Sequence, residues 1–543
     1  MSPSHRRRDP KSMSRRALMR ALAANGGILL AGTIAIETAS VAAPTAVRAA
    51  SVPPAQLRKR AVPLTPELWR RPSGLGAPPV HGLHLTFGDD PATEVVVSWT
   101  TPEPVRRPQV QFGTAEDGFG DAVEAESTRY VDGHSDRPVA VHSARIRGLD
   151  PDSIYVYAAL HDGAVPELGT IRTAPDGRAP FTFTSFGDMG APFLTSHTGS
   201  GWGNDGLGTE NSFDLVDGIE RVAPLFNLIN GDLSYAGLAN DRLRTWSGFL
   251  ANISRSARHR PWMPSAGNHE NEAGNGPIGY SAFQTYFPVP NSGATGELRG
   301  LWYAYTVGNV RFVHLQNDDV CLQDGGNTYV RGYSGGAQQT WLEHELSRTR
   351  ADDSIDWIVV CMHQVAISTA DHFNGADLGV RQSWLPLFDH YGVDLVLCGH
   401  EHHYERSHPI RGAESNLTAT PIPQGHDSRL VDTTKGTVHM VLGGGGNSAA
   451  SNALLTPDRR CRVITEVAAS RGSTGKREAT YVWENADWSS MRDAAHPYGF
   501  AAFTVDGSAR PGTTTIDVTY YGLLGAGGQL AAVDSFVLTK PAR

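Results

Sequence analysis

The pattern of hydrophobic and polar positions divides this chain into two textures. Between about residues 77 and 175, short apolar runs such as Glu94–Thr100 alternate with Gly, Pro and Asp, which is typical of strands joined by turns. From about residue 178, strand-like runs alternate instead with segments whose apolar residues repeat at helical spacing. We therefore expect an all-β domain over residues 77–175 and an α/β domain over residues 178–543.

The β texture returns in the last part of the chain. Beyond about residue 411, the runs Thr437–Leu442, Tyr498–Phe503 and Thr514–Tyr520 have the length and composition of strands. We expect these strands to form a second sheet that completes one α/β sandwich. The predicted fold class is thus α/β, with two mixed sheets flanked by helices and preceded by an all-β domain.

One tyrosine of the predicted β domain has a specific expectation attached to it. The segment Leu149–Tyr157 resembles the fibronectin type III pattern in which a Leu and a Pro precede a corner tyrosine. In such sandwiches the tyrosine hydroxyl bonds back to nearby backbone. We assign Tyr155 to that position.

The first fifty residues have the features of an export signal. Arg6–Arg8 give a positive start, Ser14–Met19 carries paired arginines, and Ala21–Val41 is weakly apolar. The paired arginines resemble the signal of the twin-arginine route, with an ordinary Sec signal or an uncleaved anchor as the alternatives. We expect a signal peptide over residues 1–50, then a Pro- and Arg-rich linker over residues 51–76, and a protein that is secreted or held in the cell wall.

The charge balance excludes some classes of partner. The whole chain carries a net charge of −9, and without its first fifty residues, which hold eight basic and two acidic side chains, it carries about −15. That balance argues against a nucleic-acid-binding surface or an anionic-membrane binder. No later apolar run approaches the ~20 residues that a membrane span needs. The affinity for an anionic substrate must therefore come from local cations, while the oligomeric state stays open.

Candidate metal ligands follow apolar runs at five places in the chain. These places are Gly187–Gly190, Gly231–Tyr235, Gly267–Glu270, Val360–His363 and Gly399–His403. The carboxyl ends of strands are where sites form in open α/β sheets, so we expect these segments to meet. Together they supply enough Asp, Tyr, Asn and His to hold two metal ions side by side, and a dinuclear site of that kind hydrolyses phosphate esters.

The residue types and spacings indicate which ions fit. Asp232 and Tyr235 lie three residues apart on one turn and can face one ion. The reference pKa of tyrosine is about 10, so only a strongly Lewis-acidic ion such as Fe(III) binds it as phenolate at neutral pH. His400 and His402 are two residues apart, so in an extended segment their rings point the same way.

In order, the five segments resemble the metallophosphoesterase signature as it occurs in purple acid phosphatases. The resemblance covers roughly residues 77–450, and the tyrosine of Gly-Asp-x-x-Tyr separates this family from other metallophosphoesterases. It implies an Fe(III) site and a divalent site of Fe, Zn or Mn that share a bridging Asp232. The implied ligands are Asp188, Tyr235 and His402 for Fe(III), and Asn268, His363 and His400 for the divalent ion.

The resemblance also implies a reaction, which is the hydrolysis of small-molecule phosphate monoesters by a metal-bound hydroxide. His269 and His372 match catalytic histidines of the family, and Asn268 joins them in binding substrate. Phe373 stands where plant-type members often have a second histidine, which leaves the protonation of the leaving group open. Two alternatives remain: a phosphodiesterase or nucleotide-cleaving enzyme with the same metals, and a non-catalytic cell-surface binding protein.

The cysteines and two charged pairs give weaker expectations. Cys361 and Cys398 lie in apolar runs and should be buried, whereas Cys321 and Cys461 have polar neighbours and are candidates for pairing after export. The pairs Asp318-Asp319 and Arg459-Arg460 are expected on the solvated surface.

Overall fold

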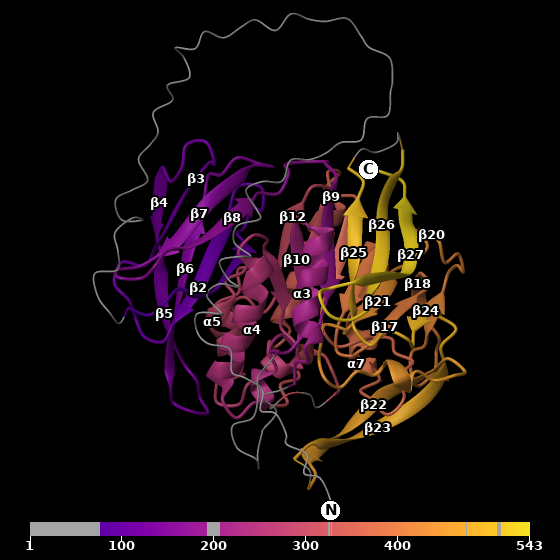
Figure 1. Ribbon diagram of the computed structural model, residues 1–543. Coiled ribbons are helices and arrows are strands. Elements are labelled where there is room, and N and C mark those ends of the chain that lie inside the picture. The colour runs from indigo at the N-terminus through magenta and orange to yellow at the C-terminus, as the bar shows by residue number, and fades with distance from the viewer. Residues whose placement is uncertain (1–76, 193–206, 324–325, 327, 474, 508–511) are drawn as a thin grey trace, which may run out of the picture. The chain divides into compact units, whose positions relative to one another are not determined.

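The computed structural model describes residues 77–192, 207–323, 326, 328–473, 475–507 and 512–543 (Figure 1). The predicted signal peptide and linker lie outside the described residues. Among the described helices, none is long and apolar enough to cross a membrane.

The first described domain is all-β, as predicted. Its strands are β1 (His81–Phe87), β2 (Val95–Thr101), β3 (Gln109–Gly113), β4 (Asp121–Glu124), β5 (Glu126–Val131), β6 (Pro138–Ile146), β7 (Ile154–Leu160) and β8 (Glu167–Arg172). They form two four-stranded sheets with the orders β1-β2-β6-β5 and β4-β3-β7-β8. Trp99 and Tyr157 are buried in the core of this domain. The prediction for Tyr155 is confirmed, because its hydroxyl accepts a hydrogen bond from the backbone N–H of Asp150 at 2.9 Å.

The second domain contains two seven-stranded mixed sheets, which confirms the predicted fold class. One sheet has the order β11-β10-β9-β25-β26-β27-β20 and the other β12-β13-β14-β16-β21-β17-β24. The strands of the first are β9 (Phe181–Phe186), β10 (Phe226–Asn230), β11 (Trp262–Ser265), β20 (Leu430–Asp432), β25 (Gly499–Val505), β26 (Thr514–Leu523) and β27 (Leu530–Lys540). Those of the second are β12 (Tyr303–Val307), β13 (Val310–His314), β14 (Trp357–Cys361), β16 (Leu395–Cys398), β17 (Tyr404–Ser407), β21 (Val438–Leu442) and β24 (Ser489–Asp493).

The remaining elements are helices and smaller sheets. The helices are α3 (Asn211–Val222), α4 (Arg242–Ala257), α5 (Ser281–Tyr286), α6 (Ala337–Arg350), α7 (Leu378–Ser383) and α8 (Leu385–Tyr391). Short 3₁₀ turns are η2 (Ala236–Leu238), η3 (Asn268–Glu270), η4 (Gly296–Leu298), η5 (Asn317–Asp319) and η6 (Asn452–Leu454). The strands β15 (Ala376–Asp377), β22 (Arg460–Arg471) and β23 (Arg477–Asn485) form a three-stranded sheet, and β18 (Ile410–Ala413) pairs with β19 (Pro421–Pro423).

Aromatic side chains fill the space between the two large sheets. The Phe183 ring stacks on Phe503 with centroids 4.7 Å apart and meets the Phe312 ring edge-on at 5.1 Å. Phe226 packs on the same cluster, and all four side chains are buried. Such offset and edge-on contacts add to the gain from burying the rings. This core holds the sheets together and so fixes the relative positions of the strand ends.

The expectation for the C-terminal strands was wrong in one respect. The three runs named in that expectation, which are β21, β25 and β26, do not form a separate sheet. Strand β21 runs parallel to β16, while β25 pairs antiparallel with β9. The tail thus completes both sheets. The local pattern of apolar and polar residues predicts that a segment is a strand. It does not predict the neighbouring strand in the sheet, which depends on long-range packing.

The expectations for Cys321 with Cys461 and for Asp318-Asp319 need correction, whereas Cys361 and Cys398 are buried and Arg459-Arg460 are exposed as expected. All four cysteines are free and buried, so Cys321 and Cys461 do not pair. Asp318 and Asp319 are buried as well, where Tyr280 and Gln364 donate to Asp318 and Ser334 donates to Asp319. Buried carboxylates that accept several hydrogen bonds look like surface residues in a sequence. The polar neighbours of Cys321 were therefore a misleading sign of exposure.

Candidate metal centre

Each predicted ligand segment lies just after a buried strand. Asp188 follows β9, Asp232 follows β10, Asn268 follows β11, His363 follows β14 and His400 follows β16. The strands β9, β10 and β11 are mutually parallel neighbours, as are β14 and β16. Parallel neighbours end at the same edge of a sheet, so the fold brings these loops together.

The backbone at this edge is strained and closely packed. Asp188, Asp232, Tyr235 and His400 have left-handed φ values of 60°, 53°, 60° and 70°. Such values are costly for residues other than glycine and persist where the surroundings enforce them. A Cβ on Gly399 would collide with the Asp188 carboxylate. Glycine at that position therefore lets two ligand-bearing loops touch.

The first cluster contains Asp188, Tyr235 and His402. The Tyr235 hydroxyl lies 3.1 Å from Asp188 Oδ1 and 3.0 Å from His402 Nε2. His402 Nε2 is in turn 3.2 Å from Asp188 Oδ1. These are the three residues predicted to hold Fe(III), and all three are buried.

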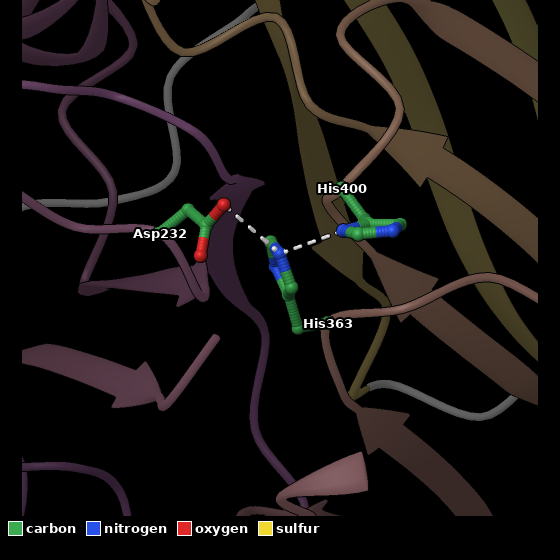
Figure 2. A group of neighbouring side chains, drawn as sticks. All are labelled: Asp232, His363 and His400. Carbon is green, nitrogen blue, oxygen red and sulfur yellow. Dashed lines mark hydrogen bonds and ion pairs between the residues drawn. The ribbon is translucent and has the colours of Figure 1, made fainter. Parts of the chain in front are cut away.

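The second cluster contains Asp232, Asn268, His363 and His400. Figure 2 shows Asp232, His363 and His400 pointing toward one another from separate loops, and one potential ligand atom from each lies within 4.8 Å of the others. His363 Nε2 lies 3.2 Å from Asp232 Oδ2, 2.9 Å from Asn268 Oδ1 and 3.2 Å from His400 Nδ1. These are the residues predicted for the divalent site.

The donor set of both clusters fits metal ions. His363 Nδ1 lies 2.7 Å from the Asn230 carbonyl and His402 Nδ1 lies 2.9 Å from the Ala449 carbonyl. A carbonyl only accepts, so each Nδ1 carries a proton. The Nε2 atom of each ring faces its cluster and offers a lone pair to a cation once it is deprotonated. Lone pairs of carboxylate, amide and imidazole groups thus converge without enough protons between them. A cation is the partner that such an arrangement requires.

The same buried carboxylates, those of Asp188 and Asp232, contribute to the raised pKa values of His363 and Tyr235. Burial disfavours the imidazolium of His363, but the carboxylates of Asp232 and Asp188 outweigh it and raise the pKa of His363 to about 10. Burial, reinforced by Asp188 and Asp232, raises the pKa of the Tyr235 phenol well above its usual range. Without a metal, protons therefore take the place of the missing positive charge.

Glu270 supports the turn that carries Asp232, and the sequence alone assigns it no role. Its buried carboxylate accepts hydrogen bonds from the backbone N–H groups of Asp232, Leu233 and Gly267, each at 2.8 Å. Burial and the nearby Asp232 carboxylate raise the pKa of Glu270 to about 8. Glu270 thus joins the two ligand-bearing loops after β10 and β11.

The structure separates the two predicted catalytic histidines. The His269 ring packs on Tyr235 with centroids 4.8 Å apart, and its Nε2 lies 3.9 Å from Asp232 Oδ2. The His372 side chain is instead 82% exposed and pairs with Asp371 at 3.3 Å. The neighbouring Phe373 ring lies edge-on to His402, with centroids 4.9 Å apart. The structure therefore brings His269 and Phe373, but not His372, against the clusters.

The fold and the two donor clusters define a dinuclear metallohydrolase, and comparisons with known proteins identify its family. A family model described as "Purple acid Phosphatase, N-terminal domain" matches residues 80–173, and one described as "Calcineurin-like phosphoesterase" matches residues 181–404. An uncharacterized protein of Mycobacterium tuberculosis is 57% identical over 479 residues, which cover 88% of this chain and 90% of the relative.

More distant relatives have named activities. The Fe(3+)-Zn(2+) purple acid phosphatase 12 of Arabidopsis thaliana is 24% identical over 80% of this chain and 85% of its own length. The structure of purple acid phosphatase PPD1 from yellow lupin superposes with a TM-score of 0.59 at 20% identity, covering 85% of this chain and 74% of that one. The present chain belongs to the purple acid phosphatase-like metallophosphoesterases and is thus a phosphoric ester hydrolase.

Metal binding to the metal-free protein should depend on pH. Because the pKa of His363 is raised to about 10, that ring holds a proton at neutral pH which a metal ion must displace. The apparent affinity for Zn²⁺ should therefore rise about tenfold per pH unit for each displaced proton between pH 6 and 8. Competition with a chromophoric chelator measures this slope. An affinity that does not change with pH would contradict the assigned protonation of His363.

Proposed function

We propose that this chain is an exported phosphatase that hydrolyses small-molecule phosphate monoesters at a dinuclear site of one trivalent and one divalent ion. Asp188, Tyr235 and His402 would hold Fe(III), and Asn268, His363 and His400 would hold Fe(II), Zn(II) or Mn(II). Asp232 would bridge the two ions. The observation that carries the proposal is that the donor atoms form two clusters. Asp232 contacts His363 of the second cluster and acts electrostatically on Tyr235 and His402 of the first.

The charges of the two clusters support this division of metals. Asp188, Asp232 and a tyrosinate from Tyr235 place three negative charges around the first ion, which suits a trivalent cation. The second cluster adds only the neutral side chains of Asn268, His363 and His400 to the shared carboxylate, which suits a divalent one. These ligand charges would leave a small positive remainder on the metal-loaded site, which would attract a phosphate oxyanion without trapping it.

The bound ions would supply Lewis acidity, which lowers the pKa of water and neutralises charge on the phosphate. The protein side chains would bind and orient the substrate. Asn268 and His269, which adjoin the divalent cluster, would orient the ester. As a neutral imidazole His269 has one N–H to give to an ester oxygen, and its buried Nδ1 has no partner in the described structure. His372 would contact the outer part of the substrate. If water attacks phosphorus directly and no covalent phosphoenzyme forms, the configuration at phosphorus should invert.

Export is proposed from the paired arginines within Ser14–Met19, which resemble the twin-arginine signal. That route carries folded proteins, so the metals would be loaded before the protein leaves the cell. The expected locations are the extracellular space or the cell wall. Cleavage within the first fifty residues of the exported protein is the corresponding observable.

Two substrates separate the proposed monoesterase from a diesterase. The metal-loaded enzyme should have a kcat/KM for nitrophenyl phosphate that exceeds its kcat/KM for bis-nitrophenyl phosphate by about tenfold or more, which corresponds to about 1.4 kcal/mol of transition-state free energy. Asp232→Ala should lose both activities because it removes the shared ligand. A faster diester reaction would replace the monoesterase proposal with the diesterase one, and a metal-loaded protein inactive on both esters would favour a binding protein.

The iron assignment predicts a spectroscopic signal. Tyrosinate bound to Fe(III) gives a visible charge-transfer band, so Tyr235→Phe should abolish the band and leave a folded protein. Tyr329→Phe is the matched control and should keep the band, because the contact found for Tyr329 among the described residues is with Arg477 of β23. An iron-containing wild-type protein with no such band would show that Tyr235 is not a ligand.

The two histidines should have separable effects on the kinetics. His269→Ala should lower kcat about 100-fold, since a positioned proton donor contributes a factor of that order. His372→Ala should act mainly on KM, because its ring points to solvent. Metal content measured alongside distinguishes lost catalysis from lost ions. A larger loss of kcat in His372→Ala than in His269→Ala would reverse these roles.

A further inference from the structure

The His400 ring contacts the side chain of Gln323, a residue outside the five segments that carry the candidate metal ligands. His400 Nδ1 faces His363 in the second cluster, at 3.2 Å. On the opposite side of the ring, His400 Nε2 lies 2.5 Å from Gln323 Oε1. The amide oxygen of Gln323 only accepts, so this contact places the ring proton on Nε2 and leaves a lone pair on Nδ1.

Asn374 fixes which way the Gln323 amide points. The Gln323 Nε2 group donates to Asn374 Oδ1 at 2.9 Å, and Asn374 Nδ2 donates to the backbone carbonyl of His400 at 2.8 Å. The three residues thus form a closed ring of hydrogen bonds. This ring contacts both the imidazole and the backbone of His400, whose φ of 70° needs such support.

The backbone of Gln323 is itself anchored. The buried carboxylate of Asp377 accepts the N–H of Gln323 at 2.9 Å and the N–H of Leu322 at 2.8 Å. The same carboxylate accepts the N–H of Gly379 at 2.7 Å, at the start of α7. Burial raises the pKa of Asp377, and these N–H donors oppose that shift. Gln323 is therefore tied to the fold beneath the site.

We propose that Gln323 is a positioning residue that keeps the proton of His400 on Nε2 and directs its Nδ1 lone pair at the divalent ion. This inference rests on the proposed function, in which His400 is a metal ligand. His363 and His402 are oriented by backbone carbonyls, which substitution does not remove. His400 depends instead on a side chain, so its orientation can be changed by a single substitution. Outer hydrogen-bond partners of metal-bound histidines typically contribute 10- to 100-fold in metal affinity.

The chemistry of the Gln323 side chain predicts how variants differ. Gln323→Leu keeps much of the volume but removes the acceptor, which frees the His400 ring to exchange tautomers. Gln323→Glu keeps an acceptor at the same reach and adds a negative charge, which makes the imidazole a stronger ligand. A purely space-filling role for Gln323 would not distinguish these variants in that order.

Zn²⁺ binding to the metal-free full-length protein tests the inference. Gln323→Leu should weaken the binding of one Zn²⁺ at least tenfold, and Gln323→Glu should bind at least as tightly as wild type. His400→Ala sets the scale for loss of the ligand. Gln339→Leu is the matched control, since the exposed Gln339 pairs only with Glu343 on α6 among the bonds of the described residues. Thermal unfolding of each metal-free variant shows that the fold is retained.

The outcomes separate this inference from the proposed function. If His400→Ala loses the Zn²⁺ and Gln323→Leu does not, the role of Gln323 is overturned while the metal site stands. If His400→Ala itself binds normally, the ligand assignment of the proposed function is wrong. If Gln323→Glu is as weak as Gln323→Leu, the acceptor is not what matters and the inference fails. Should Gln323→Leu not fold, Gln323→Met against Gln323→Glu makes the same comparison.

Discussion

The constraint on which the site depends is that carboxylate, phenol, amide and imidazole groups meet in a buried place with too few protons to pair all their lone pairs. Asp188, Tyr235 and His402 meet within about hydrogen-bond distance on one side, and Asn268, His363 and His400 meet on the other. Asp232 lies against the second group and close to His269. Bringing such groups together in a buried place costs free energy unless positive charge joins them. Two bound cations would therefore lower the free energy of this arrangement of side chains.

Packing and hydrogen bonds elsewhere in the fold hold the loops of the two clusters in place. The aromatic core around Phe183 fixes the two sheets, and their parallel strands deliver the ligand loops to one edge. Left-handed backbone at Asp188 and His400 turns side chains inward at positions where glycine would be the easier residue. Glu270 joins two of the loops through three backbone hydrogen bonds. Strain at the ligands is thus balanced by contacts that hold each loop in place.

The sequence predicted that these side chains would meet, because each candidate ligand segment follows an apolar strand. Spacing in Gly231–Tyr235 and in Gly399–His403 is local information, and the parallel topology converts it into proximity. Glu270 lies within a segment that was already singled out, so a buried acceptor for the turn could have been sought there. Gln323 had no comparable signal, because its contact with His400 joins loops far apart in sequence.

Predictions failed where tertiary packing overrides local appearance. Asp318 and Asp319 look solvated, yet nearby donors make their burial acceptable. The strand Val438–Leu442 looked like part of a separate sheet, yet its partner is β16. The role of His372 stays a prediction, but the sequence did not show that its loop places the Phe373 ring against His402 and the imidazole toward solvent. Each case concerns which groups meet, which a single sequence does not specify.

Anomalous scattering from crystals of the metal-loaded protein, recorded at the iron and zinc absorption edges, locates the ions of the proposed dinuclear site. We expect this site to show two metal peaks about 3.5–4 Å apart, the usual spacing of such pairs. One peak should lie among Asp188, Tyr235 and His402, the other among Asn268, His363 and His400, with one Asp232 oxygen on both. A single peak, or two peaks too far apart to share Asp232, would contradict the proposed site.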